Sequence, residues 1–128
     1  MARYDHLPIY KRGFDLLIWT EQCVRGFSRY HKYTLGSDLR NSVRDALKTI
    51  VEANNSRDRK PVLERLRLHL EELMLLVRVA KEVKAFPNLN SYQYAAGEVL
   101  NLSRQNEGWL RSLDRKQPES LLPDLGGE

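Results

Sequence analysis

The sequence predicts an all-α fold, an up-down-up-down antiparallel four-helix bundle in one domain. The chain has 128 residues, enough for a single domain that buries its own core. Prolines and turn residues separate four segments of similar length, and each segment carries apolar residues at helical spacing. No segment alternates apolar and polar residues with period two over any useful length. Four amphipathic helices with short connections typically form such a bundle.

The first predicted helix covers residues 8–30. Pro8 suits its first turn, because the N–H that proline lacks would have no helical partner there. Two neighbouring apolar stripes follow the helix, one with Phe14, Leu17, Ile18 and Val24, and one with Leu16, Trp19, Cys23, Phe27 and Tyr30. Together these stripes are wider than one buried face normally requires.

The second predicted helix covers residues 35–54. We expect Thr34 to cap it, because a threonine hydroxyl can accept a hydrogen bond from an unpaired N–H of the first turn, and Ser37 is the alternative cap. Gly36 is expected to be tolerated in that turn. The apolar face consists of Leu39, Val43, Ala46, Ile50 and Val51.

The third predicted helix, residues 59–85, has the clearest pattern. Its apolar residues form a heptad seam with alternating spacings of three and four: Leu63, Leu66, Leu70, Leu73, Val77 and Ala80. A second stripe contains Leu68, Leu75, Leu76, Val79 and Val83. A monomeric bundle would expose the second stripes of the first and third helices, so we expect a homo-oligomer. A thicker core within one chain that uses both stripes is the alternative.

The fourth predicted helix covers residues 91–115. Its heptad positions are Tyr92, Ala95, Val99, Leu102, Trp109 and Leu113, with Asn106 in the gap. Asn90 and Gln93 resemble a capping box. Gly97 and Gly108 each cost the helix about 1 kcal/mol relative to alanine, which indicates either close helix approach or simple tolerance. Residues 1–115 are therefore predicted to form the bundle and residues 116–128 a flexible acidic tail.

The charge balance is basic and unevenly distributed. Lys and Arg number 21 against 17 Asp and Glu, a formal net charge of +4. Residues 118–128 hold three acids and no Lys or Arg, so the bundle carries most of the positive charge. Such a body suits an anionic partner such as nucleic acid, although many ordinary small domains have a similar balance.

Two basic stripes locate this charge. Arg25, Arg29 and Lys32 are spaced i, i+4 and i+7 at the end of the first helix, and Arg40, Arg44 and Lys48 follow the second helix at i, i+4 and i+8. Aromatic residues lie between the cations of the first stripe, and aromatic rings can stack on unpaired bases. The stripes predict a binding surface for a nucleic acid or an acidic protein, and a solvated charged face is the alternative. Arg12, Arg78 and Lys81 are further candidates.

The sequence contains no recognisable catalytic motif. It has neither a glycine-rich phosphate loop nor a nucleophile elbow, and His69 lacks the preceding glutamate of a bundle di-metal site. Cys23 is the single cysteine, which predicts no intramolecular disulfide and a reducing compartment. We therefore expect a non-enzymatic protein without metal or cofactor.

No apolar run is long enough to cross a membrane and no signal-peptide core is present, so we expect a cytoplasmic protein.

Several segments together resemble a family of small bacterial four-helix bundle proteins. They are Leu-Pro-Ile-Tyr-Lys-Arg-Gly-Phe-Asp-Leu-Leu at 7–17, Tyr-Thr-Leu-Gly-Ser-Asp-Leu-Arg at 33–40, Ile50 with Ala53 and Asn54, the leucine-rich run 63–80, and Gly-Trp-Leu at 108–110. The resemblance covers residues 7–113. This family includes proteins encoded within ribosomal RNA intervening sequences and Avd, the accessory variability determinant of diversity-generating retroelements. The Tyr-Thr-Leu-Gly form and the arginine-rich body are more similar to Avd.

The resemblance to Avd implies a four-helix bundle that assembles into a basic, ring-shaped homopentamer. It implies a non-catalytic protein that binds the reverse transcriptase of the retroelement and its template RNA or DNA, and that supports mutagenic retrohoming. A protein of the intervening-sequence type, acting as a structural or protein-interaction module, is the alternative. The resemblance assigns no binding residue, so the nine candidate cations rest on the charge pattern alone.

Overall fold

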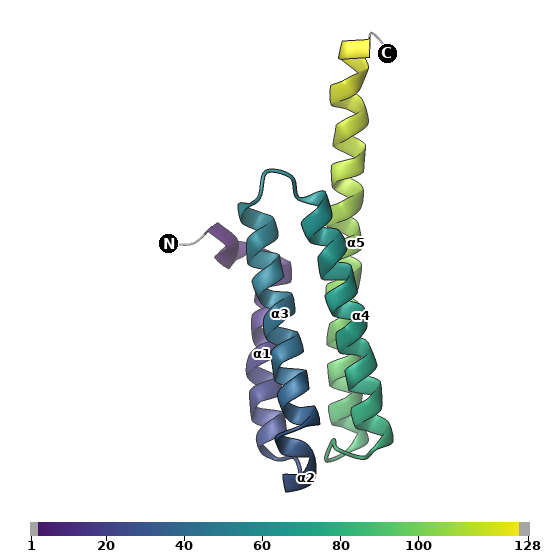
Figure 1. Cartoon of the computed structure of the whole chain (residues 1–128). Coiled ribbons are helices and arrows are strands. Elements are labelled where there is room, and N and C mark those ends of the chain that lie inside the picture. Colours follow the sequence, from purple (N-terminus) through teal and green to yellow (C-terminus); the bar gives the residue numbers. More distant parts are fainter. Residues whose placement is uncertain (1–2, 126–128) are drawn as a thin grey trace.

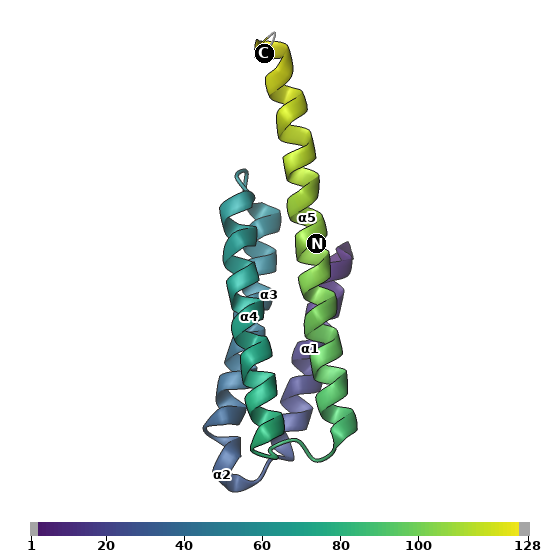
Figure 2. The same cartoon turned by 90° about the vertical axis from the view of Figure 1, so that its right-hand side faces the viewer.

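A computed structural model describes the backbone of residues 3–125 and the side chains of residues 4–115. The described chain contains helices and no strand: η1 (Arg3–His6), α1 (Pro8–Arg25), α2 (Arg29–Lys32), α3 (Leu35–Asn55), α4 (Lys60–Glu82) and α5 (Leu89–Leu125). The four long helices run alternately up and down (Figure 1). In the order α1, α3, α4, α5, each packs against its neighbours, and α5 closes the bundle on α1 (Figure 2). The predicted four-helix fold is confirmed.

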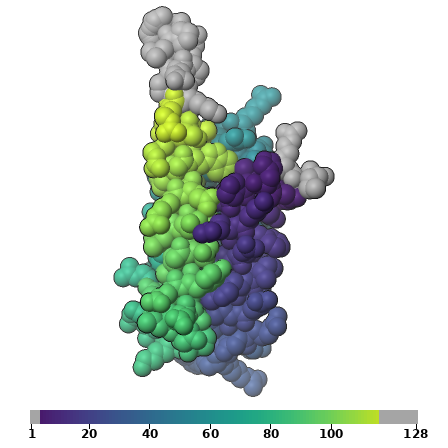
Figure 3. Space-filling model, turned by 180° about the vertical axis from the view of Figure 1, so that it is seen from behind, coloured from purple at the N-terminus to yellow at the C-terminus, as the bar shows by residue number. Residues whose placement is uncertain are grey.

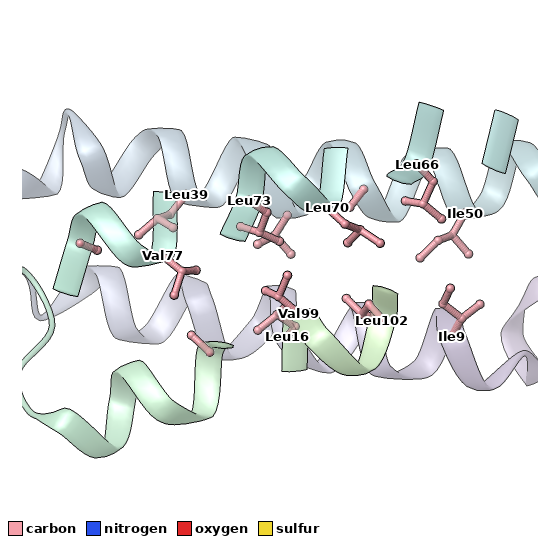
Figure 4. Close-up of a cluster of buried hydrophobic side chains, with 14 of the residues drawn as sticks. Ile9, Leu16, Leu39, Ile50, Leu66, Leu70, Leu73, Val77, Val99 and Leu102 are labelled. Carbon is pink, nitrogen blue, oxygen red and sulfur yellow. The ribbon is translucent and has the colours of Figure 1, made fainter. Parts of the chain in front are cut away.

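The heptad seam of α4 forms the centre of the core. All six seam residues, Leu63 to Ala80, are at most 2% exposed. Side chains from the other three long helices meet them, among them Leu16, Ile50 and Leu102 (Figure 4). Burial of one such side chain contributes about 1.5–3 kcal/mol before conformational entropy is subtracted, so this seam dominates the packing.

The first helix is shorter than predicted, because α1 ends at Arg25 and not at Tyr30. Gly26 caps it and donates its backbone N–H to the Cys23 carbonyl, and Ser28 adopts an extended conformation before the single turn of α2. Glycine and serine are poorer helix formers than alanine or leucine, and serine favours N-cap positions. The apolar pattern continues across both residues, which explains why helical spacing alone did not reveal the break.

The turn into α3 differs from the prediction in two respects. Thr34 occupies the N-cap position, but its hydroxyl donates to the Tyr30 carbonyl at 3.1 Å and does not cap α3. A Cβ at Gly36 would lie 2.6 Å from Val24 Cγ1. Gly36 is therefore required by the close approach of α3 to the end of α1, beyond the simple tolerance expected from the sequence.

The α4–α5 connection also begins earlier than predicted. Lys84 has a φ of 61°, and its N–H donates to the Lys81 carbonyl while the Ala85 N–H donates to the Ala80 carbonyl. This pair of bonds is a Schellman motif, which ends α4 at Glu82. The side chain of Asn88 then caps α5 by accepting a 2.8 Å hydrogen bond from the Ser91 N–H, in place of the expected capping box.

The last helix is longer than predicted. The sequence placed its end at Arg115, yet α5 continues to Leu125 and projects past the rest of the bundle (Figure 1). The prediction treated Pro118 as a helix stop because proline disfavours a helix interior, yet the backbone of α5 stays helical through both Pro118 and Pro123. Residues 126–128 of the expected tail lie outside the described residues, and its flexibility stays a prediction.

Three residues inside α5 had no structural explanation from the sequence alone. A Cβ at Gly97 would meet nothing within 4 Å, and one at Gly108 only an Arg111 side-chain nitrogen at 3.8 Å, so simple tolerance explains both glycines. Asn106 is fully buried, and its Nδ2 donates a 3.0 Å hydrogen bond to the Leu63 carbonyl of α4.

The glycines of α3 and α5 give opposite expectations for alanine substitution. Gly36→Ala should lower the free energy of unfolding by about 1–3 kcal/mol, because the new methyl group overpacks against Val24. Gly97→Ala should raise it by up to about 1 kcal/mol, because the site is open and alanine has the higher helix propensity. Urea unfolding of both variants measures the difference. Equal stability of the two would contradict this account of Gly36.

Candidate nucleic-acid interface

The first basic stripe lies at the corner between α1 and α3, in a segment that we call the α2 corner (residues 25–34). Arg25 ends α1, whereas Arg29 and Lys32 belong to α2, so the three cations do not share one continuous helix as predicted. No Asp or Glu occurs between Glu21 and Asp38 in the sequence. Within the described chain, no carboxylate lies within 4.0 Å of these three side chains. Among the described residues these charges therefore have no acidic partner, and Arg25 and Arg29 are exposed while Lys32 is half-buried.

Contacts of the residues on either side of α2 fix the backbone of the α2 corner. Phe27, immediately before α2, is buried and meets the Phe86 ring edge-on at a centroid distance of 5.8 Å. Gly36 after it packs against Val24, and the Thr34 hydroxyl bonds to the Tyr30 carbonyl. These contacts fix the backbone of the corner, and none of the four α2 side chains is buried.

The second basic stripe lies on α3 and faces α1. Arg44 forms a 2.6 Å ion pair with Glu21 of α1, and Arg40 lies 3.8 Å from the other oxygen of the same carboxylate. Glu21 is thus a paired acid that bridges α1 to two arginines of α3. Glu21 offsets one of the positive charges of this stripe. Lys48 has no carboxylate within 4.0 Å in the described chain.

A shallow groove of about 200 Å³ lies beside this stripe, between α1 and α3. Tyr10 and Leu17 line it from α1, and Leu47 and Val51 line it from α3 together with Arg44 and Lys48. An apolar floor beside cations is the combination that a protein segment with apolar and acidic residues would fit.

The remaining candidate cations are distributed over other faces. Arg12 pairs with Glu98 at 3.2 Å, across the face where α1 and α5 lie side by side (Figure 3). Lys81 lies 4.0 Å from Glu82 and 5.0 Å from the centre of the Tyr92 ring. Arg78 is exposed on α4. The structure thus brings neither Arg12 nor Arg78 into the α2 corner.

One cation was missed by the sequence analysis. Lys84 is exposed in the α4–α5 connection, at the same end of the bundle as α2 in both views (Figures 1 and 2). The sequence placed it inside a helix, and only the end of α4 two residues earlier shows that it belongs to the connection.

Most of the second apolar stripe of α4 lies on the surface. Leu68 and Leu75 are 63% and 61% exposed, and Val79 and Val83 are also exposed. On α1, Phe14 and Ile18 are exposed as well. Other members of the predicted stripes do reach the core: Val24 is buried, and Leu17 and Leu76 pack against the core. The core therefore uses parts of both stripes, as the alternative of a thicker core expects, and leaves the residues named above at the surface.

The fold and its surface define a small helical bundle protein with an unpaired cationic corner. A family profile described as bAvd-like matches residues 7–113. The chain belongs to this family, and the resemblance to Avd is confirmed. Avd-like proteins are accessory and non-catalytic. Kinship with the intervening-sequence proteins stays a prediction. Comparison with curated proteins and with solved structures finds no match.

None of the helices in residues 3–125 combines the length and the apolar character that a membrane span requires.

The single cysteine should be a poor nucleophile. Burial raises the pKa of the Cys23 thiol to about 11, so its thiolate fraction at about pH 8 is about a hundredfold smaller than that of an ordinary cysteine. We expect iodoacetamide to label the folded protein at least that much more slowly than a free thiol, with the full rate restored in concentrated guanidinium chloride. Mass spectrometry of timed samples measures both rates. Rapid labelling of the folded chain would contradict the burial of this side chain.

Proposed function

We propose that this protein is a non-catalytic accessory protein of a diversity-generating retroelement. It binds the reverse transcriptase and the template RNA or DNA through its basic surface and supports mutagenic retrohoming in the cytoplasm. The observation that carries the nucleic-acid part is the α2 corner, where Arg25, Arg29 and Lys32 have no carboxylate partner among the side chains of residues 4–115. Membership of the bAvd-like family supports the accessory role.

Whether a cation is paired with a carboxylate decides how much we expect it to contribute to nucleic-acid affinity. An unpaired cation that neutralises a phosphate releases condensed counterions, which favours binding at low salt. Arg40 and Arg44 share Glu21, so phosphate must compete with that carboxylate for them. We therefore expect the α2 corner to contribute more to nucleic-acid affinity than the α3 stripe.

The α1/α3 groove is the part of the surface that best fits the reverse transcriptase. Its apolar floor, with Leu17 and Val51, excludes water from a contact, and Lys48 at its edge attracts acidic side chains. Nucleic acid offers phosphates to the cations but little that matches an aliphatic floor.

Self-assembly into a ring of five copies is also part of the proposal. The exposed stripe of α4, with Leu68 and Leu75 as its most exposed members, is the kind of apolar surface that association removes from water. A second copy of the chain is its proposed occupant, because the family resemblance implies a homopentamer, and in a ring the stripe of one copy would meet a different surface of the next copy.

A structural module of the intervening-sequence type remains the second candidate, favoured only by the resemblance. The surroundings of the gene distinguish the two. A neighbouring reverse transcriptase gene with paired template and variable repeats supports the accessory role, whereas a position inside a ribosomal RNA gene supports the module.

Charge reversal tests the α2 corner. The variant Arg25→Glu/Arg29→Glu/Lys32→Glu should weaken RNA binding at least about tenfold at low salt and make its salt dependence less steep, because up to three phosphate contacts are lost. Fluorescence anisotropy with a labelled RNA across a salt series measures both quantities, and circular dichroism checks the fold.

A matched control makes the same change of net charge elsewhere. Arg57, Arg104 and Arg111 are exposed and lie outside the corner, so Arg57→Glu/Arg104→Glu/Arg111→Glu should weaken binding less. If both variants lose affinity equally, the binding reflects total charge and the location of the interface is wrong.

Substitution of the exposed leucines tests the assembly. In Leu68→Lys/Leu75→Lys, the new lysines follow Glu64 and Glu71 by four residues, a spacing that supports the helix. We expect the wild-type protein to have about five times the 15.0 kDa mass of one chain in light scattering, and the variant to be smaller while remaining helical. Gln22→Lys/Gln93→Lys adds the same charge at exposed polar positions and should leave the mass unchanged. A monomeric wild-type protein would refute the ring.

A further inference from the structure

The α2 corner exposes two aromatic rings among its cations. Tyr30 and Tyr33 are 83% and 70% exposed, the highest values among the exposed large hydrophobic side chains of the described residues. Neither ring contributes to the core. Such rings are usually placed against other elements, as Tyr92 is against Phe86, so two nearly free rings on one short segment need a separate explanation.

The spacing of the two tyrosines places their Cβ atoms on the same side of the α2 turn. Tyr30 lies in α2 and Tyr33 follows three residues later at its C-cap, and residues three apart on a helical turn have Cβ atoms about 5–6 Å apart. The rings of His31 and Tyr30 are nearly perpendicular, with 5.0 Å between centroids, and 83% of the Tyr30 surface stays exposed. The Lys32 Nζ lies 6.0 Å from the centre of the Tyr33 ring.

The chemistry of the corner is that of a platform for unpaired bases. Aromatic rings stack on the faces of any base, while neighbouring cations contact the phosphates of the same strand. Arg25 at the end of α1 and Arg29 at the start of α2 supply such cations in the same corner, whose sequence contains no acid that would repel the strand. The backbone is fixed by Phe27 and Thr34, so binding does not have to order it.

A duplex would not use these features. In a duplex the base faces are stacked on one another, and only base edges and phosphates are accessible. The four residues of α2 form a single turn, whereas groove readers present a recognition helix or a β-ribbon to the major groove. Against a duplex the cations would still bind phosphates, but the tyrosines would remain without a contact.

We propose that the α2 corner is a binding site for single-stranded nucleic acid, in which unpaired bases stack on Tyr30 and Tyr33 and adjacent phosphates contact Arg25, Arg29 and Lys32. This proposal rests on the proposed function and specifies the form of its nucleic-acid partner. The bundle discriminates single strands from duplexes through two rings, while the cations bind both forms.

The test compares two probes with one double variant. A labelled oligouridylate of about 15 nucleotides provides unpaired bases, and an RNA duplex of the same length provides phosphates alone. Tyr30→Ala/Tyr33→Ala should bind the single strand about tenfold to a hundredfold more weakly, bind the duplex within about twofold of the unsubstituted protein, and keep the same salt dependence. Both side chains are exposed, and circular dichroism checks that the variant is folded.

Two further variants separate stacking from other effects. Tyr30→Phe/Tyr33→Phe keeps the rings and should retain the affinity for the single strand. Phe14→Ala removes an exposed ring from α1 and should change neither affinity. A strand with 2-aminopurine reports stacking independently of affinity, because its emission changes when the base stacks, and this change should be lost in the alanine variant only.

Several outcomes would overturn the inference. They are unchanged binding of the single strand by the alanine variant, an equal loss with both probes, and a loss of reverse transcriptase binding without any loss of RNA binding, which would make the rings a protein contact. If Arg25→Glu/Arg29→Glu/Lys32→Glu weakens RNA binding while the alanine variant does not, the inference fails and the proposed function stands. If neither variant weakens it, the nucleic-acid part of the proposed function fails as well.

Discussion

The burial of one apolar seam on α4 is the constraint on which the rest of the structure depends. Leu63, Leu70 and Val77 are part of a line that side chains from α1, α3 and α5 enclose. This packing satisfies the hydrophobic requirement of a small domain with one face of each helix. The outer faces are therefore free to carry charge, and the short connections at the ends are free to present side chains that contribute nothing to the core.

The sequence predicted the long elements and failed at their ends, for physical reasons. Periodicity records which face of a helix is buried, so it located α3 within one residue and identified the whole α4 seam. It does not record where a backbone turns. Gly26 and Ser28 break a pattern whose apolar spacing continues, and Lys84 adopts a positive φ that glycine usually occupies. Conversely, a proline read as a stop lies within α5.

The sequence predicted which cations belong to the candidate surface, but not which of them are paired or which neighbouring side chains are exposed. Charge spacing alone found the cations of the α2 corner and of α3. Whether each is free depends on the register between helices, and that register brings Glu21 of α1 to Arg44. No local pattern contains this information, because the pair is separated by 23 residues. Exposure likewise depends on tertiary packing: Phe27 and Tyr30 belong to one predicted stripe, yet Phe27 is buried and Tyr30 almost wholly exposed.

The buried amide of Asn106 has a consequence for how the chain reaches this fold. Its Nδ2 finds the Leu63 carbonyl, and its Oδ1 has no partner among the described residues. Helices with repeating leucines can associate in several registers of similar apolar area. A slip by one turn would remove the amide from its carbonyl and cost about 1–3 kcal/mol, so misaligned collapsed states are penalised before the core closes. The same penalty applies to an α5 that packs out of register on a second copy, since only a correctly aligned helix restores the bond.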